Sequence, residues 1–236
     1  MVQTRAFLVL GISLIIGLGL FGHQVGKAVQ KGRAFDRFLT VRGLAELEVK
    51  ADLAIWPIKF SARSEQLGPL KTELEAAKAK VVKYLLGKGV KPEELNFGVP
   101  AVQDREELKA NTNSREMARY LGAYTLVVRS PNVDLVKEAM RDADKLIADN
   151  VSLSSNDWDE HSQFLFTRLN EVKPDMIKSA TANARAAAEK FAQDSGSKVG
   201  AIRKATQGLV EVEDRDPASP ERKKLRVVTS IDFFLE

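Results

Sequence analysis

The chain has 236 residues, of which 44% are hydrophobic and 29% charged, with a formal net charge of +4 and no cysteine. This length is enough for a sizeable hydrophobic core, and the lack of cysteine excludes disulfides, thiolate metal sites, thiol catalysis and lipid attachment at cysteine. The net charge resides in residues 1–40, where five basic side chains accompany one acidic one, while residues 41–236 carry 31 of each sign. A neutral folded part lacks the excess of Lys and Arg that phosphate backbones require, so we expect no nucleic-acid partner.

The N-terminal segment has the pattern of an export signal. A short positive start precedes 16 uncharged residues from Ala6 to Phe21. This run suits the core of a signal peptide and is slightly shorter than the roughly 20 residues of a spanning helix, although residues 22–25 would extend it. The residues that we expect to contact the membrane are Ala6, Phe7, Leu8, Leu10, Ile15, Ile16, Leu20 and Phe21.

Residues 1–26 are interpreted as a retained signal anchor, followed by a basic linker at 27–40 that lies over anionic headgroups. Gly26-Lys-Ala28 has the small-x-small pattern of a cleavage site, so a cleaved signal peptide is the alternative. The basic residues after the apolar run, Lys27 among them, would by the positive-inside rule keep that end in the cytoplasm. The location of the folded part therefore depends on further features of the sequence.

Residues 41–236 alternate between extended and helical patterns. Apolar alternation and turn residues predict strands at 41–49, 53–62, 96–102 and 119–129, short strands at 151–153 and 163–169, and a closing hairpin of 198–212 and 225–235. Pro57 interrupts the second strand, which places that strand at an edge or at a bulge. Apolar residues at spacings of three and four predict helices at 70–85, 135–147 and 176–195.

The third helix is rich in alanine. Pro174 precedes it and Gly196 is a natural left-handed stop. Alanine side chains are small, so this helix can approach a sheet closely, and they offer no ligand or proton donor. We interpret it as a packing helix whose buried face consists of Ile177, Ala180, Ala184, Ala187 and Phe191.

The end of this helix carries a resemblance to a known family. The segment Ala184-Arg-Ala-Ala-Ala-Glu-Lys-Phe-Ala-Gln-Asp-Ser-Gly-Ser-Lys-Val-Gly-Ala-Ile202 resembles the signature of SIMPL-domain proteins, a bacterial cell-envelope family that includes the YggE-type periplasmic proteins. The segments 41–49 and 120–128 are similar to its opening and central strands, and the alternation from Val227 to Leu235 is similar to its last strand. The segment Asn156-Asp-Trp-Asp-Glu-His161 departs from the family pattern.

The resemblance implies an α+β fold, an extracytoplasmic location, ring-like homo-oligomers and loose links to envelope or oxidative stress, with no established active site. The predicted fold is α+β with mixed or antiparallel sheets and about three packing helices. We expect two strand-helix-strand halves plus the C-terminal helix and β-hairpin, preceded by one transmembrane or signal helix. Residues 41–236 would form a SIMPL-like domain in the periplasm, anchored to the inner membrane, or soluble there after signal cleavage. Here the family resemblance outweighs the positive-inside rule.

Side chains for catalysis are scarce in the folded part. His161 is its one histidine and a weak candidate for acid-base chemistry beside acidic neighbours such as Asp159. No spacing indicates a metal or cofactor site, so we expect neither and no enzyme activity. Trp56 and Trp158 either form an interface with a partner, lie at the lipid boundary or belong to the core.

The sequence thus favours a non-catalytic, membrane-tethered envelope protein that assembles with copies of itself. The alternative is a periplasmic protein that binds a small molecule or peptide between helices and sheet. A hydrolase that uses His161 is a further alternative.

Overall fold

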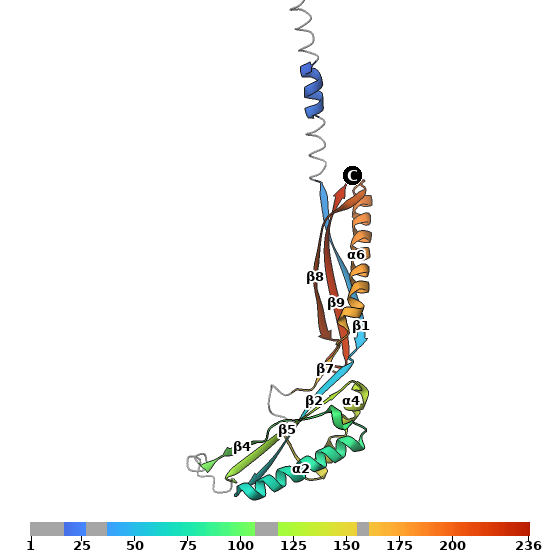
Figure 1. Cartoon of the computed structure of the whole chain (residues 1–236). Helices are drawn as coiled ribbons and strands as arrows, with labels where there is room; N and C mark the ends of the chain where they lie inside the picture. The colour runs from blue at the N-terminus through green and yellow to red at the C-terminus, as the bar shows by residue number, and fades with distance from the viewer. Residues whose placement is uncertain (1–16, 27–36, 107–117, 155–160) are drawn as a thin grey trace, which may run out of the picture. The chain divides into compact units, whose positions relative to one another are not determined.

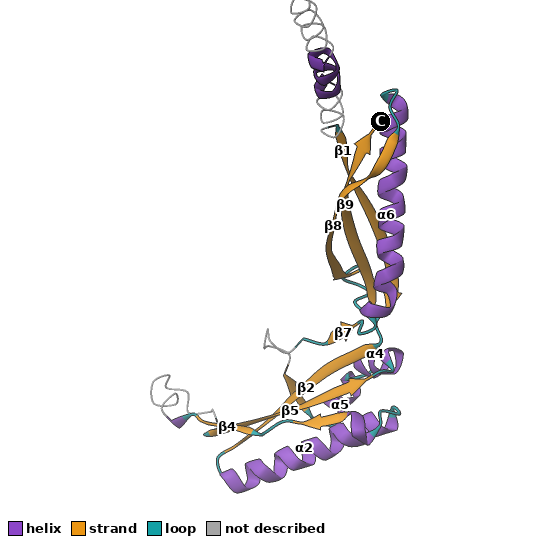
Figure 2. Cartoon of the chain, turned by 45° about the horizontal axis from the view of Figure 1, so that its top comes forward, coloured by secondary structure: helices purple, strands orange, loops and turns teal. Residues whose placement is uncertain are grey.

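The structure is a computed structural model that describes residues 17–26, 37–106, 118–154 and 161–236 (Figure 1). Helices and antiparallel sheets confirm the predicted α+β class (Figure 2). The elements follow in the order β1 (Phe38–Lys50), β2 (Leu53–Ser64), α2 (Leu67–Gly87), the 3-10 helix η1 (Pro92–Glu94), β3 (Leu95–Phe97), β4 (Ala101–Asp104), β5 (Tyr120–Ser130), α4 (Val133–Arg141), α5 (Asp144–Ala148), β6 (Ser152–Ser154), β7 (Gln163–Leu165), α6 (Leu169–Asp194), β8 (Val199–Asp214) and β9 (Arg222–Leu235).

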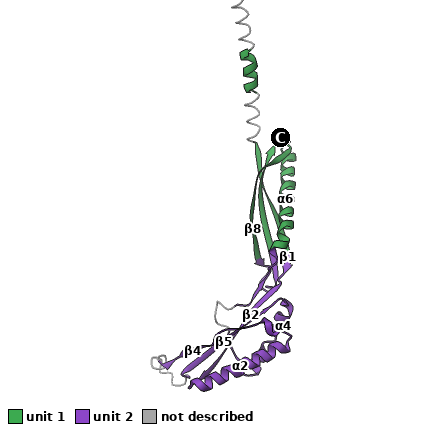
Figure 3. Cartoon of the chain, in the orientation of Figure 1, with its two compact units in different colours: residues 1–47, 170–212, 225–236 green, residues 48–169, 213–224 purple. Residues whose placement is uncertain are grey.

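These elements form two compact units, coloured separately in Figure 3. Unit 1 comprises residues 1–47, 170–212 and 225–236, and unit 2 comprises residues 48–169 and 213–224. The expected strand-helix-strand halves are present as β2-α2-β3 and β5-α4-α5-β6, and both lie in unit 2, whereas most of β1 lies in unit 1. The first and last parts of the folded sequence combine into one unit, and the middle part forms most of the other.

The N-terminal segment is described only at residues 17–26, which are helical and include Leu20 and Phe21 of the expected anchor. The other expected anchor residues, Ala6, Phe7, Leu8, Leu10, Ile15 and Ile16, lie outside the described residues. In the part of the chain that the structure describes, no helix combines the length and the apolar character needed to span a membrane. The anchor remains a prediction from the sequence.

Unit 2 contains a six-stranded antiparallel sheet in which β5 and β2 are central neighbours. β3 and β4 pair with β5, and β6 and β7 pair with β2. Residues that alternate along β2 and β5, such as Phe60 and Tyr124, meet on one face, and their stacked rings have centroids 5.5 Å apart. The amphipathic α2 covers this face, so the period-2 and period-3.6 patterns bury the same core.

Two predictions for unit 2 needed correction. The expected strand at 96–102 is two short strands, β3 and β4, which pair with different parts of β5. The expected helix at 135–147 is interrupted after Arg141 and continues as α5. Leu146 of the second segment is buried, whereas its expected partner Ile147 is 62% exposed.

Unit 1 consists of α6 and a three-stranded sheet in the order β1-β9-β8. In both views α6 runs beside β1 and β9 (Figures 1 and 2). Gly43 of β1 makes the closest approach: a Cβ atom there would lie 1.9 Å from the Ala180 carbonyl oxygen and 2.6 Å from the Ala184 nitrogen. The predicted close packing of the alanine helix on a sheet is thus confirmed, and a glycine in the strand makes it feasible.

The buried face of α6 differs in part from the prediction. Ala180 and Ala184 are buried as expected, but Phe191 is 62% exposed, and Ile177 and Ala187 are only half-buried. The buried residues recur every four positions: Met176, Ala180, Ala184, Ala188 and Ala192. Apolar residues form two adjacent stripes along the helix. The stripe that packs against β1 and β9 is the one that has smaller residues toward the C-terminal end of α6.

α6 also begins earlier than expected. It starts at Leu169 and includes Pro174, and the expected strand at 163–169 is reduced to β7. Pro174 lies within the first two turns, so it removes only one backbone hydrogen bond from a helix of 26 residues.

Candidate ligand pocket and exposed strand

A pocket opens on the side of β2 opposite β5, between the residues of β2 that pair with β7 and those that pair with β6. β7 pairs with residues 53–55 of β2 and β6 pairs with residues 59–61. Trp56, Pro57 and Ile58 therefore pair with β5 on one side and with no described strand on the other. Because Pro57 lacks an N–H group, a strand opposite it would lose a ladder hydrogen bond. The predicted edge at Pro57 is thus a local gap in strand pairing, while β2 as a whole lies inside the sheet.

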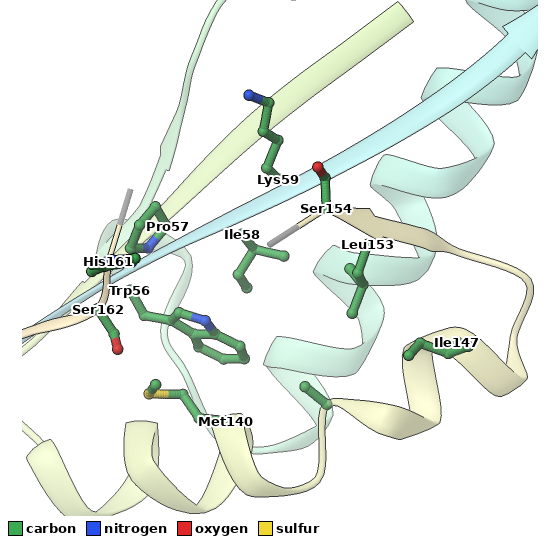
Figure 4. A pocket seen from close by; sticks show the side chains of 11 residues that line it. Trp56, Pro57, Ile58, Lys59, Met140, Ile147, Leu153, Ser154, His161 and Ser162 are labelled. Carbon is green, nitrogen blue, oxygen red and sulfur yellow. The ribbon is translucent and has the colours of Figure 1, made fainter. Parts of the chain in front are cut away.

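The pocket in this gap has a volume of about 530 Å³, within the range of small-molecule sites (Figure 4). It is lined by Trp56, Pro57, Ile58, Lys59, Met140, Ala143, Ile147, Leu153, Ser154, His161 and Ser162. The indole of Trp56 is partly buried and packs against the core of unit 2. The two interpretations of Trp56 therefore both apply in part, since one side of this residue belongs to the core and another lines the pocket.

The large apolar side chains of the lining lie together on one side of β2. In Figure 4 Trp56, Met140 and Leu153 lie on one side of the β2 ribbon, while the Lys59 side chain extends on the other. Met140 and Leu153 also pack against the core, so the pocket is an opening in the side of the hydrophobic interior. Such a site suits an apolar or aromatic body with a polar end.

His161 is exposed and lies at the rim of this pocket. Among the described residues it has no hydrogen bond to Ser154 or Ser162, the two hydroxyl groups of the lining. A nucleophile and its base normally lie within hydrogen-bond reach of each other. The described side chains also include no cluster of three or more potential metal ligands.

The structure brings together two residues that the sequence analysis treated separately, Trp56 and His161. Trp158, the other expected interface residue, lies outside the described residues. Met140, Lys59 and Ser154 were not identified from the sequence as lining residues. Their one sequence signal was indirect: a proline inside a strand indicates a gap in pairing, but it does not tell which distant segments border that gap.

A second candidate surface lies on β8 of unit 1. This strand is at the edge of its sheet, and none of its 16 residues is buried. Leu209 is 89% exposed, Ile202 48% and Val212 41%. These apolar side chains make the exposed strand β8 a candidate surface for contact with a partner.

The edge of β8 is not regular. From Lys198 to Arg215 the chain advances 17 residues, while the partner segment from Arg222 to Glu236 advances 14, as the hydrogen bonds at the two ends show. An antiparallel ladder accommodates three extra residues as β-bulges. Bulges disfavour the addition of another strand, so β8 is suited to contacts through its side chains rather than to a continuous extension of the sheet.

The structure is thus an α+β protein with two antiparallel sheets packed against helices, a pocket of ligand size in unit 2 and an exposed edge strand in unit 1. The chain matches the sequence profile of SIMPL, a family described as proteins of unknown function (DUF541), over residues 39–230. Because this match spans most of the chain, the protein belongs to the SIMPL family.

Other comparisons add little to this assignment. No curated protein matches the chain. The crystal structure of a hydrolase from Listeria innocua aligns with 81% of this chain and 92% of its own length, at 13% sequence identity and a TM-score of 0.22. A TM-score this low supports no argument about fold or activity.

Proposed function

We propose that this SIMPL-family protein is a non-catalytic component of the bacterial cell envelope, tethered to the inner membrane by its N-terminal segment, with its folded part in the periplasm. It assembles with copies of itself, and a role in envelope or oxidative stress would follow from its family. The observation that carries the assembly is the exposure of β8, above all of Leu209 at 89%. The tether is supported by the 16 uncharged residues between Ala6 and Phe21.

Assembly through β8 follows from the energy of apolar burial. Covering a leucine side chain contributes roughly 1.5–3 kcal/mol, which corresponds to roughly a tenfold to hundredfold change in the dissociation constant for each leucine that a partner copy covers. A charged residue at position 209 should therefore weaken the assembly strongly while leaving the fold intact, because Leu209 does not belong to either hydrophobic core.

The test is the mass of the native particle, extracted from its own membrane fraction in mild detergent and measured by light scattering. We expect a uniform particle of several copies for the wild type and a smaller mass for Leu209→Lys at the same concentration. Val99→Lys is the matched control, because Val99 is also 89% exposed but belongs to unit 2. A wild-type monomer, or equal dissociation of both variants, would contradict assembly through β8. Release from the membrane without detergent would contradict the tether.

The pocket at Trp56 favours a second candidate function, the binding of a small molecule or peptide in the same compartment. A ligand present at 100 times its dissociation constant stabilises the folded state by about 2.7 kcal/mol. We expect a ligand of this pocket to raise the melting temperature of the wild type, and the rise should disappear in Trp56→Ala. A ligand whose effect persists in that variant binds elsewhere.

A further inference from the structure

The tip of the β8–β9 hairpin, residues 213–224, belongs to unit 2, although most of both strands belongs to unit 1. Hydrogen bonds within the tip give it a defined structure. The Arg215 side chain donates to the Asp216 carboxylate at 2.8 Å and to the Ser219 hydroxyl at 3.2 Å. The tip therefore contacts the rest of unit 2 as one ordered segment.

Glu221 connects the tip to two other parts of unit 2. Its backbone carbonyl accepts a hydrogen bond from the amide of Ala51, in the turn between β1 and β2, at 2.8 Å. Its Oε1 atom lies 2.5 Å from Nζ of Lys137 on α4, and the residue as a whole is 8% exposed. Because these three segments are far apart in the chain, the docked tip helps to fix α4 relative to the turn.

The second carboxylate oxygen of Glu221 makes this contact sensitive to protons. Oε2 is buried and has no hydrogen-bond partner among the described residues. A proton on this atom would create an O–H donor without an acceptor in a buried site, and it would remove the negative charge that faces Lys137. The docked tip therefore favours the ionised carboxylate, and protonation favours release of the tip.

The charges that act on Glu221 also favour its ionised form. They include the cations Lys137 from α4 and Arg215 and Arg222 from the tip. Further charges on the same segments pair with each other, Lys50 with Asp134 and Lys223 with Asp214.

The direction of the pH dependence follows from these contacts. Burial opposes the charged form of Glu221, but hydrogen bonds from Lys137 and from its own backbone N–H outweigh burial, so the pKa of this carboxyl lies below its usual value of 4.5. A pKa that is lower in the docked state than in the released state means that docking is stabilised above pH of about 4.5 and is lost as the pH falls through the lower value.

The helix α4 links this contact to the pocket at Trp56. Lys137 and Met140 are three residues apart and are therefore neighbours on the surface of α4. Met140 lines the pocket, where Figure 4 shows it beside Trp56. A helix of nine residues moves as a rigid element, so a displacement at Lys137 also displaces the wall that Met140 forms.

We propose that the tip is a proton-sensitive latch for this pocket. Docked through ionised Glu221, the tip holds α4 in the position that forms the Met140 wall, and protonation of Glu221 releases the tip and opens the pocket further. The inference rests on the pocket at Trp56 as the proposed binding site. Its test needs no ligand, so failure of the latch can be distinguished from failure of ligand binding.

The test follows two signals in the full-length protein in detergent. The first is hydrogen exchange of the Ala51 amide, measured by NMR on protein with isotope-labelled alanine and expressed as protection relative to the intrinsic exchange rate. It reports docking of the tip, because this amide donates to Glu221. The second is quenching of Trp56 fluorescence by acrylamide, measured in a Trp158→Phe variant that leaves Trp56 as the one tryptophan. It reports access to the pocket.

Glu221→Gln keeps the size of the side chain and removes its charge. At neutral pH this variant should reduce the protection of the Ala51 amide about tenfold, as loss of a hydrogen bond to a charged group does, and should increase the quenching of Trp56. Glu213→Gln is the matched control, because Glu213 is an exposed carboxylate in the same tip, and it should leave both signals at their wild-type values. Equal effects of the two variants would overturn the proposal, as would loss of Ala51 protection without a change at Trp56.

The pH dependence identifies the group that titrates. In the wild type we expect both signals to change together as the pH falls below about 4.5, and we expect no such change in Glu221→Gln. A response of the same size in that variant would assign the effect to other carboxylates and overturn the proposal. Should Glu221→Gln fail to fold, Lys137→Met removes the exposed partner of the pair and should produce the same two changes at neutral pH. Wild-type signals in folded Lys137→Met would show that the pair does not hold the tip.

Discussion

Replacement of Gly43 by alanine tests the packing on which unit 1 depends. The added Cβ atom would lie 1.9 Å from the Ala180 carbonyl oxygen and 2.6 Å from the Ala184 nitrogen. Both are backbone atoms of α6, so no side-chain rotation can relieve the overlap. Either the helix or the strand must move by roughly 1 Å or more, which would open the packing of the buried alanine stripe.

The expected cost follows from this geometry. Inserting a methyl group into a packed core usually costs roughly 1–3 kcal/mol, and backbone overlap places this variant at or above the upper end. We therefore expect Gly43→Ala to lower the free energy of unfolding by about 3 kcal/mol or more. A difference below about 0.5 kcal/mol would refute the close approach of α6 to β1, because changes of that size are typical of uncrowded surface sites.

Chemical denaturation followed by two probes locates the effect. Circular dichroism in the far ultraviolet reports helices in both units, whereas both tryptophans belong to unit 2. We expect the transition seen by circular dichroism to shift to lower denaturant. Gly68→Ala is the control, because a Cβ atom at Gly68 in α2 meets no atom within 4 Å. Its free energy of unfolding should stay unchanged or rise by up to about 1 kcal/mol through helix propensity.

Four further variants test ion pairs and His161. Hydrogen bonds from Lys88 and then from Lys145 lower the pKa of Asp142 to about 2. This carboxylate therefore stabilises the fold above pH of about 4, and its contribution is lost as the pH falls toward about 2. Asp142→Asn should flatten the stability curve in that range, and an unchanged curve would contradict the pairing. The Nζ atom of Lys137 lies 2.5 Å from Oε1 of the buried Glu221. Lys137→Met should lower the free energy of unfolding by about 1–3 kcal/mol, and Glu221→Gln added to this variant should recover part of the loss. Further destabilisation in the double variant would argue against an unpaired charge as the cause. His161→Ala should change the free energy of unfolding by less than about 0.5 kcal/mol, because the residue is exposed. If this variant folds but loses a hydrolytic activity that the wild type has, the protein is an enzyme.

Local patterns in the sequence predicted where helices and strands lie better than they predicted which of them pair or pack together. The long helix α2 and the strand β5 were expected close to their observed bounds, because each repeats one period over many residues. The segment after Pro131 was expected as one helix because its apolar spacing continues through the break at residues 142–143. A single period cannot reveal such a break when no Gly or Pro marks it.

The candidate sites were less accessible to sequence reasoning. Pro57 indicated an interruption in strand pairing, but the pocket also needs Met140 from α4 and His161 from beyond β6, which only the pairing of β6 and β7 with β2 brings close. Likewise Ala101, Ala123 and Ser61, which lie opposite one another on β4, β5 and β2, have no common feature in the linear sequence. Their alignment in one row is a consequence of strand register, which depends on long-range pairing.

The sequence by itself determined the types and order of most elements, the neutral folded part, the lack of thiol chemistry, the charge pattern of the N-terminal segment and the family. These properties follow from composition, from short-range periodicity or from a signature within one segment, and each can be evaluated without knowing which residues meet. Tertiary structure alone decided that residues 41–47 fold with 170–212 and 225–236, which stripe of α6 is buried, and where β2 lacks a partner. The physical reason is that these features arise from packing between residues far apart in the chain, whose energies depend on register and shape rather than on local pattern.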